Sequence, residues 1–171
     1  GKHMAIVGAG LAGLTLANRM KSAGWRVTLI EKARGPGGRL STRRRDGGQF
    51  DHGAQYFTAR TDRFSREIAR WAREGWVEQW NGSLALWRDS RVEPDIGGRP
   101  RWVGVPRMSG LTRALSAELN IVAGSRASGL TRSGSSWSVH TESGESHHGF
   151  DWVVFTCPGP QAAALAPAES P

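Results

Sequence analysis

Cysteine and tyrosine are scarce in this chain, since Cys157 and Tyr56 each occur once among 171 residues. A single cysteine excludes a disulfide within the chain and is typical of a reducing compartment, so we expect a cytoplasmic protein. No apolar run approaches the roughly 18 residues of a membrane-spanning helix. The first apolar run is only as long as a strand and leads directly into glycines. We therefore expect no signal peptide and no membrane partner.

Lysine is also rare, so the net charge of +8 comes almost entirely from arginine. Such a balance suits nucleic acid, an anionic surface or an anionic cofactor as a partner. The arginines are scattered along the chain, apart from a cluster at residues 43–45, and no recognisable nucleic-acid-reading motif accompanies them. A basic nucleic-acid-binding protein therefore ranks last among the alternatives, and we expect no nucleic-acid partner.

Glycine, by contrast, is abundant, with 23 residues, and the first of them form an ordered motif. The apolar run Ala5–Val7 predicts a buried parallel strand, and residues 14–20 predict a helix. Between them lie Gly8, Gly10 and Gly13, with the spacing G-x-G-x-x-G. In such a motif the first glycine turns the chain sharply, the second lets the backbone touch a pyrophosphate, and the third lets helix and strand pack closely. The helix N-terminus offers free N–H groups to the phosphates.

A second predicted strand supports a nucleotide-binding interpretation. Ala23-Gly24 is a helix stop, residues 25–30 read as a strand, and Glu31 follows it directly. An acid at this place binds the two hydroxyls of an adenosine ribose and repels the 2′-phosphate of NADP, although Lys32 and Arg34 are close by. An ordinary βαβ unit that binds no nucleotide is the alternative interpretation.

The loop 32–39 is rich in glycine and proline, so it cannot be a strand or a helix interior. Gly37, Gly38 and Arg39 at its end are suited to bring a backbone and a guanidinium onto a second phosphate of the same ligand. A flexible surface loop is the alternative.

The middle of the chain predicts shorter elements. Residues 46–48 form a turn, and residues 49–58 begin as a strand that glycine interrupts, which often marks close backbone approach to a ligand. His52 is a candidate base, although a lone histidine beside an aspartate is more often structural. Thr61-Asp62 cap a predicted helix over residues 63–73, whose apolar stripe we expect in the core.

Residues 75–105 change to short β-like pieces at 76–80, 84–87 and 101–105. Asn81-Gly82 predicts a hairpin turn between the first two pieces. The polar stretch 88–100 predicts the start of an inserted second lobe. The tryptophans of this part of the chain are explained as core residues: Trp71, Trp76, Trp80 and Trp87.

The last third of the chain predicts a return to the first sheet. A helix is expected over residues 108–119, with Leu111, Leu115 and Leu119 on one face. The remaining elements are a parallel strand at 120–123, a β-meander of three polar strands at 126–132, 136–141 and 146–149, a buried strand at 151–156, and a helix from 161.

Five motifs in this order are similar to those of one family. They are V-G-A-G-L-A-G at 7–13, G-G-R-L-S-T at 37–42, D-H-G-A-Q-Y-F-T at 51–58, W-V-G-V-P at 102–106, and V-V-F-T-C-P at 153–158, followed by Gln161. Over nearly its whole length the chain resembles the N-terminal half of renalase-like, FAD-dependent oxidoreductases of the amine-oxidase superfamily.

The resemblance implies FAD as cofactor and a small-molecule substrate. Family members oxidise small organic substrates, including amines and reduced nicotinamides, by passing a hydride to flavin and then to oxygen. The resemblance places Arg39 on the phosphates, Ala54 and Gln55 near the flavin, and the Ala127 backbone at the adenine. The implied cofactor-binding residues are Gly8, Gly10, Leu11, Ala12, Gly13, Glu31, Lys32, Gly38, Arg39, Ala54, Gln55, Tyr56, Ala127 and Thr156.

The fold class expected from these features is α/β, a Rossmann-like FAD/NAD(P)-binding domain with a three-layer ββα sheet, a β-meander and the start of a second substrate lobe. Residues 4–74 form the first FAD-binding segment, 75–105 the partial substrate lobe, and 106–171 the return to the FAD-binding domain. Gly1–His3 are left out as a vector-derived extension. An NAD(P)-binding reductase, or a nucleotide-binding module without oxidase activity, is the alternative function.

The chain departs from the family in length. Family members are about twice as long, and the rest of the substrate lobe and a late strand and helix that close over the flavin have no counterpart here. We therefore expect a fragment, or a truncated product with an incomplete site, and no catalytic residue is assigned. Exposed apolar surface left by the missing part predicts dimerisation or instability.

Overall fold

The computed structural model describes residues 1–95 and 98–167. Its contacts divide the chain into two compact units: Gly1–Ser41 with Thr112–Pro171, and Thr42–Leu111. The bounds of these units differ from those of the predicted FAD-binding and substrate-lobe segments, 4–74, 75–105 and 106–171. That functional division therefore stays a prediction. Within the described ranges, no helix has the length and apolar character needed to cross a membrane.

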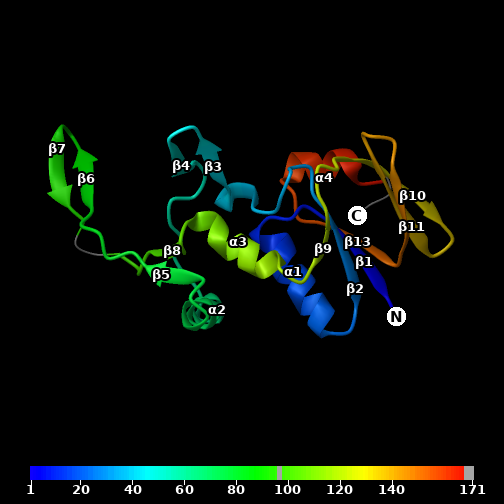
Figure 1. Cartoon of the computed structure of the whole chain (residues 1–171), viewed down its shortest axis with the longest axis horizontal. Coiled ribbons are helices and arrows are strands. Elements are labelled where there is room, and N and C mark those ends of the chain that lie inside the picture. Colours follow the sequence, from blue (N-terminus) through cyan, green and yellow to red (C-terminus); the bar gives the residue numbers. More distant parts are fainter. Residues whose placement is uncertain (96–97, 168–171) are drawn as a thin grey trace. The chain divides into compact units, whose positions relative to one another are not determined.

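The first unit is built on a parallel sheet of four strands, in the order β13-β1-β2-β9 (Figure 1). Every residue of the central strand β1 is buried, as expected of a parallel strand that is covered on both faces. The strands are β1 (His3–Val7), β2 (Arg26–Ile30), β9 (Asn120–Val122) and β13 (Trp152–Phe155). The parallel strands predicted at both ends of the chain are therefore confirmed.

Helix α1 (Leu11–Ser22) connects β1 to β2 and packs on both strands. It buries Leu14 and Ala17, the apolar face that the βαβ interpretation requires. The side-chain amide of Asn18 donates to the Leu115 carbonyl oxygen at 2.8 Å. This bond ties α1 to the C-terminal part of α3 (Met108–Ser116).

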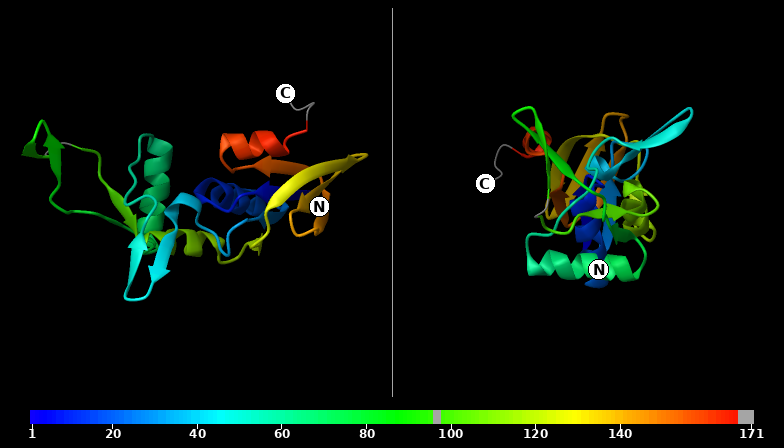
Figure 2. Two further views of the ribbon diagram at one scale, coloured as in Figure 1. Left: turned by 90° about the horizontal axis from the view of Figure 1, so that it is seen from above. Right: turned by 90° about the vertical axis from the view of Figure 1, so that its left-hand side faces the viewer.

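The β-meander consists of β10 (Ala127–Ser133), β11 (Ser136–Thr141) and β12 (Ser146–Phe150), paired antiparallel in that order (Figure 2). Ala5 and Ile30 of the parallel sheet form one buried cluster with Val139 and Phe150 of the meander. The sheet thus lies between α1 and the meander (Figure 1), which confirms the predicted three-layer arrangement. Helix α4 (Gly159–Leu165) follows β13.

The described residues of the second unit form two hairpins, one short strand pair and one complete helix. Its elements are β3 (Thr42–Arg45) paired with β4 (Gly48–Asp51), helix α2 (Asp62–Arg73), β5 (Val77–Gln79) paired with β8 (Trp102–Gly104), and β6 (Ala85–Arg88) paired with β7 (Arg91–Pro94). The backbone N–H of Phe64 donates to the Thr61 hydroxyl at 3.2 Å. The predicted cap of α2 is therefore confirmed.

The apolar stripe of α2 forms the core of this second unit. Ile68 and Trp71 are each only 1% exposed. The rings of Phe57 and Phe64 pack on Trp71 with centroids 6.5 and 5.9 Å away. The prediction of core tryptophans is right for Trp71. It is wrong for Trp80 and for Trp87 of the β6–β7 hairpin, which are 39% and 74% exposed.

The hairpin predicted at Asn81-Gly82 is wrong. Strand β5 pairs with β8, and the backbone N–H of Trp80 continues that pairing by donating to the Arg101 carbonyl at 2.8 Å. The hairpin forms instead between β6 and β7, where Asp89 and Ser90 have φ of 48° and 61°. Left-handed conformations at both turn residues match the twist of a two-residue hairpin, and aspartate tolerates that region. Long-range pairing of β5 therefore overrides the local Asn-Gly turn signal.

The first strand begins at His3, one residue before the predicted domain. His3 is buried, its Nε2 lies 2.9 Å from the Thr28 hydroxyl, and its ring packs on Phe150 at a centroid distance of 4.6 Å. Burial, together with the nearby Arg26 charge, lowers the pKa of His3 below its ordinary value of 6.5. The fold therefore favours the neutral imidazole.

This lowered pKa predicts acid sensitivity. A group that binds a proton more weakly in the folded state contributes its full stability above its unfolded pKa of 6.5, and this contribution decreases as the pH falls below that value. We expect the melting temperature of the wild type to fall as the pH is lowered from 7.5 to 5.5. The melting temperature of a His3→Gln variant should fall by less over the same interval. His52→Gln, at an exposed position, is the matched control. Equal acid losses in wild type and His3→Gln would contradict the prediction.

Candidate functional site: a glycine-lined anion site at the carboxyl end of the sheet

The turn after β1 can be built only from glycine at two positions. Gly8 has φ of +108°, and its N–H donates to the Ile30 carbonyl at 2.9 Å. A Cβ on Gly13 would overlap the Gly8 carbonyl oxygen and would lie 2.7 Å from Thr156 Oγ1. The first turn of α1 therefore lies in direct contact with the end of β1, as the G-x-G-x-x-G motif requires.

The N-terminus of α1 faces this turn with unpaired N–H groups. The first helical hydrogen bond runs from Leu14 N to the Gly10 carbonyl at 2.9 Å, which leaves the N–H groups of Leu11, Ala12 and Gly13 without partners in the helix. No acidic residue lies in the first turn, and no side chain caps it. Together with the helix dipole, these donors provide a site for an anion such as phosphate.

The Gly37-Gly38 segment packs directly on the first glycine turn. Gly37 N donates to the Ala9 carbonyl at 2.9 Å. A Cβ on Gly38 would lie 3.2 Å from Gly10 Cα, and Gly38 has φ of +54°. Its position thus requires glycine for both conformation and space. Arg39 follows it, exposed, on a 3₁₀ turn (Gly38–Leu40).

Glu31 lies buried behind the same turn. One carboxylate oxygen accepts a hydrogen bond from Ala9 N at 2.7 Å, and the other accepts one from Ala33 N at 2.8 Å. The carboxylate thus connects the first glycine turn to the start of the loop at residue 32. The neighbouring Lys32 is exposed, and its Nζ donates to Gln161 Oε1 at 3.3 Å.

Two further predicted cofactor-binding residues, Thr156 and Ala127, also lie in the first unit. The Thr156 hydroxyl contacts the Gly8 and Val7 carbonyl oxygens at 3.0 and 3.2 Å, so it braces the glycine turn. Ala127 is half-buried at the start of the meander. Burial raises the pKa of the adjacent Cys157 thiol, which favours its protonated, weakly nucleophilic form.

Ala54, Gln55 and Tyr56 belong to the second unit, and their predicted place at the flavin stays a prediction. Tyr56 is 40% exposed and packs on Trp80 with ring centroids 5.9 Å apart. The Arg101 guanidinium lies 5.1 Å from the Tyr56 ring centre and pairs with Asp95 at 2.5 Å. His52, the candidate base, is exposed.

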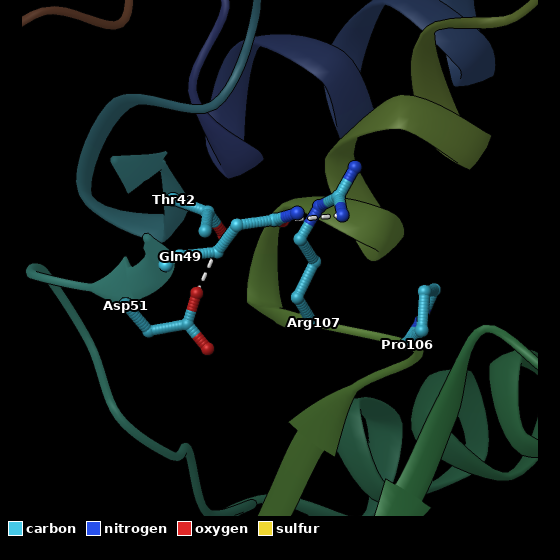
Figure 3. Close-up of a pocket in the computed structure, with 6 residues that line it drawn as sticks. Thr42, Gln49, Asp51, Pro106 and Arg107 are labelled. Carbon is cyan, nitrogen blue, oxygen red and sulfur yellow. Dashed lines mark hydrogen bonds between the residues drawn. The ribbon is translucent and has the colours of Figure 1, made fainter. Parts of the chain in front are cut away.

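The structure also reveals a polar hollow of about 540 Å³ within the second unit (Figure 3). Asp51 and Thr42 lie on one side of it, and Pro106 and Arg107 lie on the other. Asp51 was part of a motif in the sequence, but nothing local to that motif revealed its partners. They come from residues 42 and 108.

Comparisons with known proteins agree with this geometry. Residues 6–73 match the family described as an NAD(P)-binding Rossmann-like domain. A neurosporene-forming phytoene desaturase of Cereibacter sphaeroides is 45% identical over 53 residues, which are 31% of this chain and 10% of that protein. A putative L-amino-acid oxidase of Bacillus subtilis is 49% identical over 43 residues, 25% of this chain and 9% of that protein.

Among solved structures, a putative protoporphyrinogen oxidase from an Exiguobacterium species superposes with a TM-score of 0.76 at 15% sequence identity. The superposition covers 98% of this chain and 62% of that chain. The chain thus spans less than two thirds of the protein it superposes on, and it matches only about a tenth of each of the two curated relatives named above. These matches confirm the Rossmann-like fold class and the predicted resemblance to the N-terminal part of the FAD-dependent amine-oxidase superfamily.

The two hydrogen bonds to Glu31 predict a stability effect. In Glu31→Gln one buried carboxylate oxygen becomes an amide NH₂, which meets a backbone N–H instead of accepting from it. We expect a loss of about 1–3 kcal/mol in the free energy of unfolding, measured by urea titration. Glu118→Gln is the control, because the Glu118 side chain is 83% exposed in its ion pair with Lys21 and such pairs contribute little. Equal losses in the two variants would refute the structural role of Glu31.

Proposed function

We propose that this chain forms the cofactor-binding part of an FAD-dependent oxidoreductase. The proposed reaction transfers a hydride from a small amine or reduced nicotinamide-type substrate to FAD and then to oxygen. The observation that carries the proposal is the convergence of Gly10, Gly38 and Glu31 at the carboxyl end of the parallel sheet. Ligands of open α/β sheets bind at this end.

The residues present fit a dinucleotide pyrophosphate. Among the described residues, and apart from its chain neighbours, an added Cβ on Gly10 would meet only Gly38 Cα, at 4.0 Å. The outer side of Gly10 is therefore open to a ligand. The N–H groups at 11–13 donate to one phosphate, and the exposed Arg39 guanidinium offers donors to the other. Glu31 orients the ribose hydroxyls through the lone pairs that its backbone hydrogen bonds leave open.

The bound flavin supplies the redox chemistry. The residues of this chain bind the cofactor, orient it and set the charge around it, and no catalytic residue is assigned. The similarity to a putative amino-acid oxidase and to a desaturase supports the oxidoreductase class. We further propose a small-molecule substrate, no nucleic-acid or membrane partner, a cytoplasmic location, and self-association through exposed apolar residues such as Trp87 and Val92.

An NAD(P)-binding reductase or nucleotide-binding module is the second candidate. The family match at residues 6–73 is to an NAD(P)-binding domain, which favours it. Against NADP stands the Glu31 carboxylate, which repels a 2′-phosphate. The three-stranded meander fits a flavoprotein better than a plain dehydrogenase. A direct titration with NAD and FAD separates the two candidates, and tighter binding of NAD would favour the second.

The cofactor proposal predicts flavin absorbance. We expect the purified chain to carry flavin bands in the blue and near-ultraviolet, or to acquire them and quench flavin fluorescence when FAD is added. A colourless protein that leaves added FAD fluorescent would refute the proposal.

A glycine variant sharpens this test. Gly10→Ala adds a methyl group that meets Gly38 Cα only at ordinary contact distance, 4.0 Å, and φ is −78°. We therefore expect the fold to tolerate it while the pyrophosphate is displaced. We expect FAD affinity to fall at least about tenfold, which corresponds to about 1.4 kcal/mol, with an unchanged melting temperature. Gly129→Ala, also in open space, is the control and should bind FAD like wild type. Equal FAD affinity in both variants would contradict the placement of the phosphates.

A further inference from the structure

Two side chains at the base of the β3–β4 hairpin hold the beginning of α3. The Thr42 hydroxyl donates to one carboxylate oxygen of Asp51 at 2.5 Å, and it accepts a hydrogen bond from Ser109 N at 3.3 Å. The other carboxylate oxygen of Asp51 accepts a hydrogen bond from Met108 N at 3.3 Å. Figure 3 shows the Asp51 carboxylate directed at Thr42 on one side of the hollow. We call Thr42 and Asp51 the clamp.

The clamp acts as the N-terminal cap of α3. The first N–H groups of a helix have no partner within it, and a polar residue just before the helix usually accepts from them. Here Pro106 and Arg107 precede Met108, and neither side chain carries an acceptor. The clamp supplies the acceptors from the distant hairpin, so the start of α3 depends on Asp51 and Thr42.

The clamp also lies close in sequence to the two places where the chain passes between the compact units. Thr42 is the first residue of the second unit, and the chain returns to the first unit within α3, after Leu111. Both hydrogen bonds to α3 lie within the second unit. The clamp therefore fixes the outgoing and returning segments to each other.

The segment just before the clamp is the Gly-Gly-Arg loop. Leu40 N donates to the Gly37 carbonyl at 3.0 Å, and Ser41 N donates to the Gly38 carbonyl at 3.2 Å. Ser41 is bonded covalently to Thr42. One residue, Ser41, thus separates Thr42 from the 3₁₀ turn that carries Arg39.

We propose that Asp51 is a positioning residue, which acts through Thr42 to hold the Gly37–Ser41 loop in its phosphate-contacting conformation. This inference rests on the proposed FAD site. It assigns Asp51 a role in cofactor affinity, although Asp51 does not belong to the glycine-lined site itself.

Asp51→Asn and Thr42→Val test the proposal. Each removes part of the clamp at nearly constant size. We expect each variant to bind FAD about tenfold more weakly, and the double variant to lose no more than either single one, because the two residues act as one unit. Thr42→Ser keeps the hydroxyl and should restore wild-type affinity. Additive losses, or no rescue by serine, would overturn the proposal.

The control variants lie in the same hairpin. Asp46→Asn makes the same chemical change at an exposed turn residue, and Gln49→Ala removes only the exposed link to Arg107. Both should bind FAD like wild type. A comparable loss of affinity in these controls would assign the effect to general loosening of the hairpin and overturn the proposal.

Amide hydrogen exchange of the chain without cofactor separates this proposal from the proposed function. We expect exchange at Leu40 and Ser41, and at Met108 and Ser109, to increase about tenfold in Asp51→Asn but not in Asp46→Asn. If wild type fails to bind FAD, the proposed function fails while this arm still tests the clamp. If FAD binds but exchange increases only at Met108 and Ser109, Asp51 is merely a helix cap and the positioning role is refuted.

Discussion

The close approach between Gly13 and the Gly8 carbonyl is the contact on which the rest of the first unit depends. With no Cβ at residue 13, α1 leaves β1 at contact distance, and Thr156, which directly follows β13, can brace the turn. The same approach points the first N–H groups of α1 outward past the strand ends. Any larger residue would separate helix from sheet, so the packing of the fold and the anion site have one common cause.

A second layer of backbone contacts is built on this turn. Gly37 and Gly38 close against Ala9 and Gly10. Glu31 then accepts from Ala9 on one side and from Ala33 on the other. A buried carboxylate is costly unless hydrogen bonds compensate it, and here two backbone donors do so. The loop around the site is thus held mainly by backbone groups, with Glu31 as the side chain that organises them.

This reliance on the backbone explains how much of the site the sequence predicts. Glycine spacing, a strand of five residues and an acid at the strand end are local requirements, and each is visible in a short window. By contrast, the residues with which a strand or a side chain pairs are not determined by the local sequence. Asn81-Gly82 has a good turn sequence, yet β5 pairs with residues 102–104. Likewise, the partners of Asp51 lie at Thr42 and, 57 positions away, at Met108, so no spacing rule near residue 51 reveals its role.

The division of the chain also places the glycine-lined site within a single unit. Every residue that forms the glycine-lined site lies in the first unit, and none of its contacts needs the second. The observed site is thus a backbone-defined cradle within one unit, whereas the exposed aromatic side chains of Tyr56 and Trp80 belong to the other. The clamp at Thr42 and Asp51 lies where the chain leaves the cradle. By bonding Thr42 to Asp51 and to the start of α3, it restricts the residue that directly follows the Gly37–Ser41 loop.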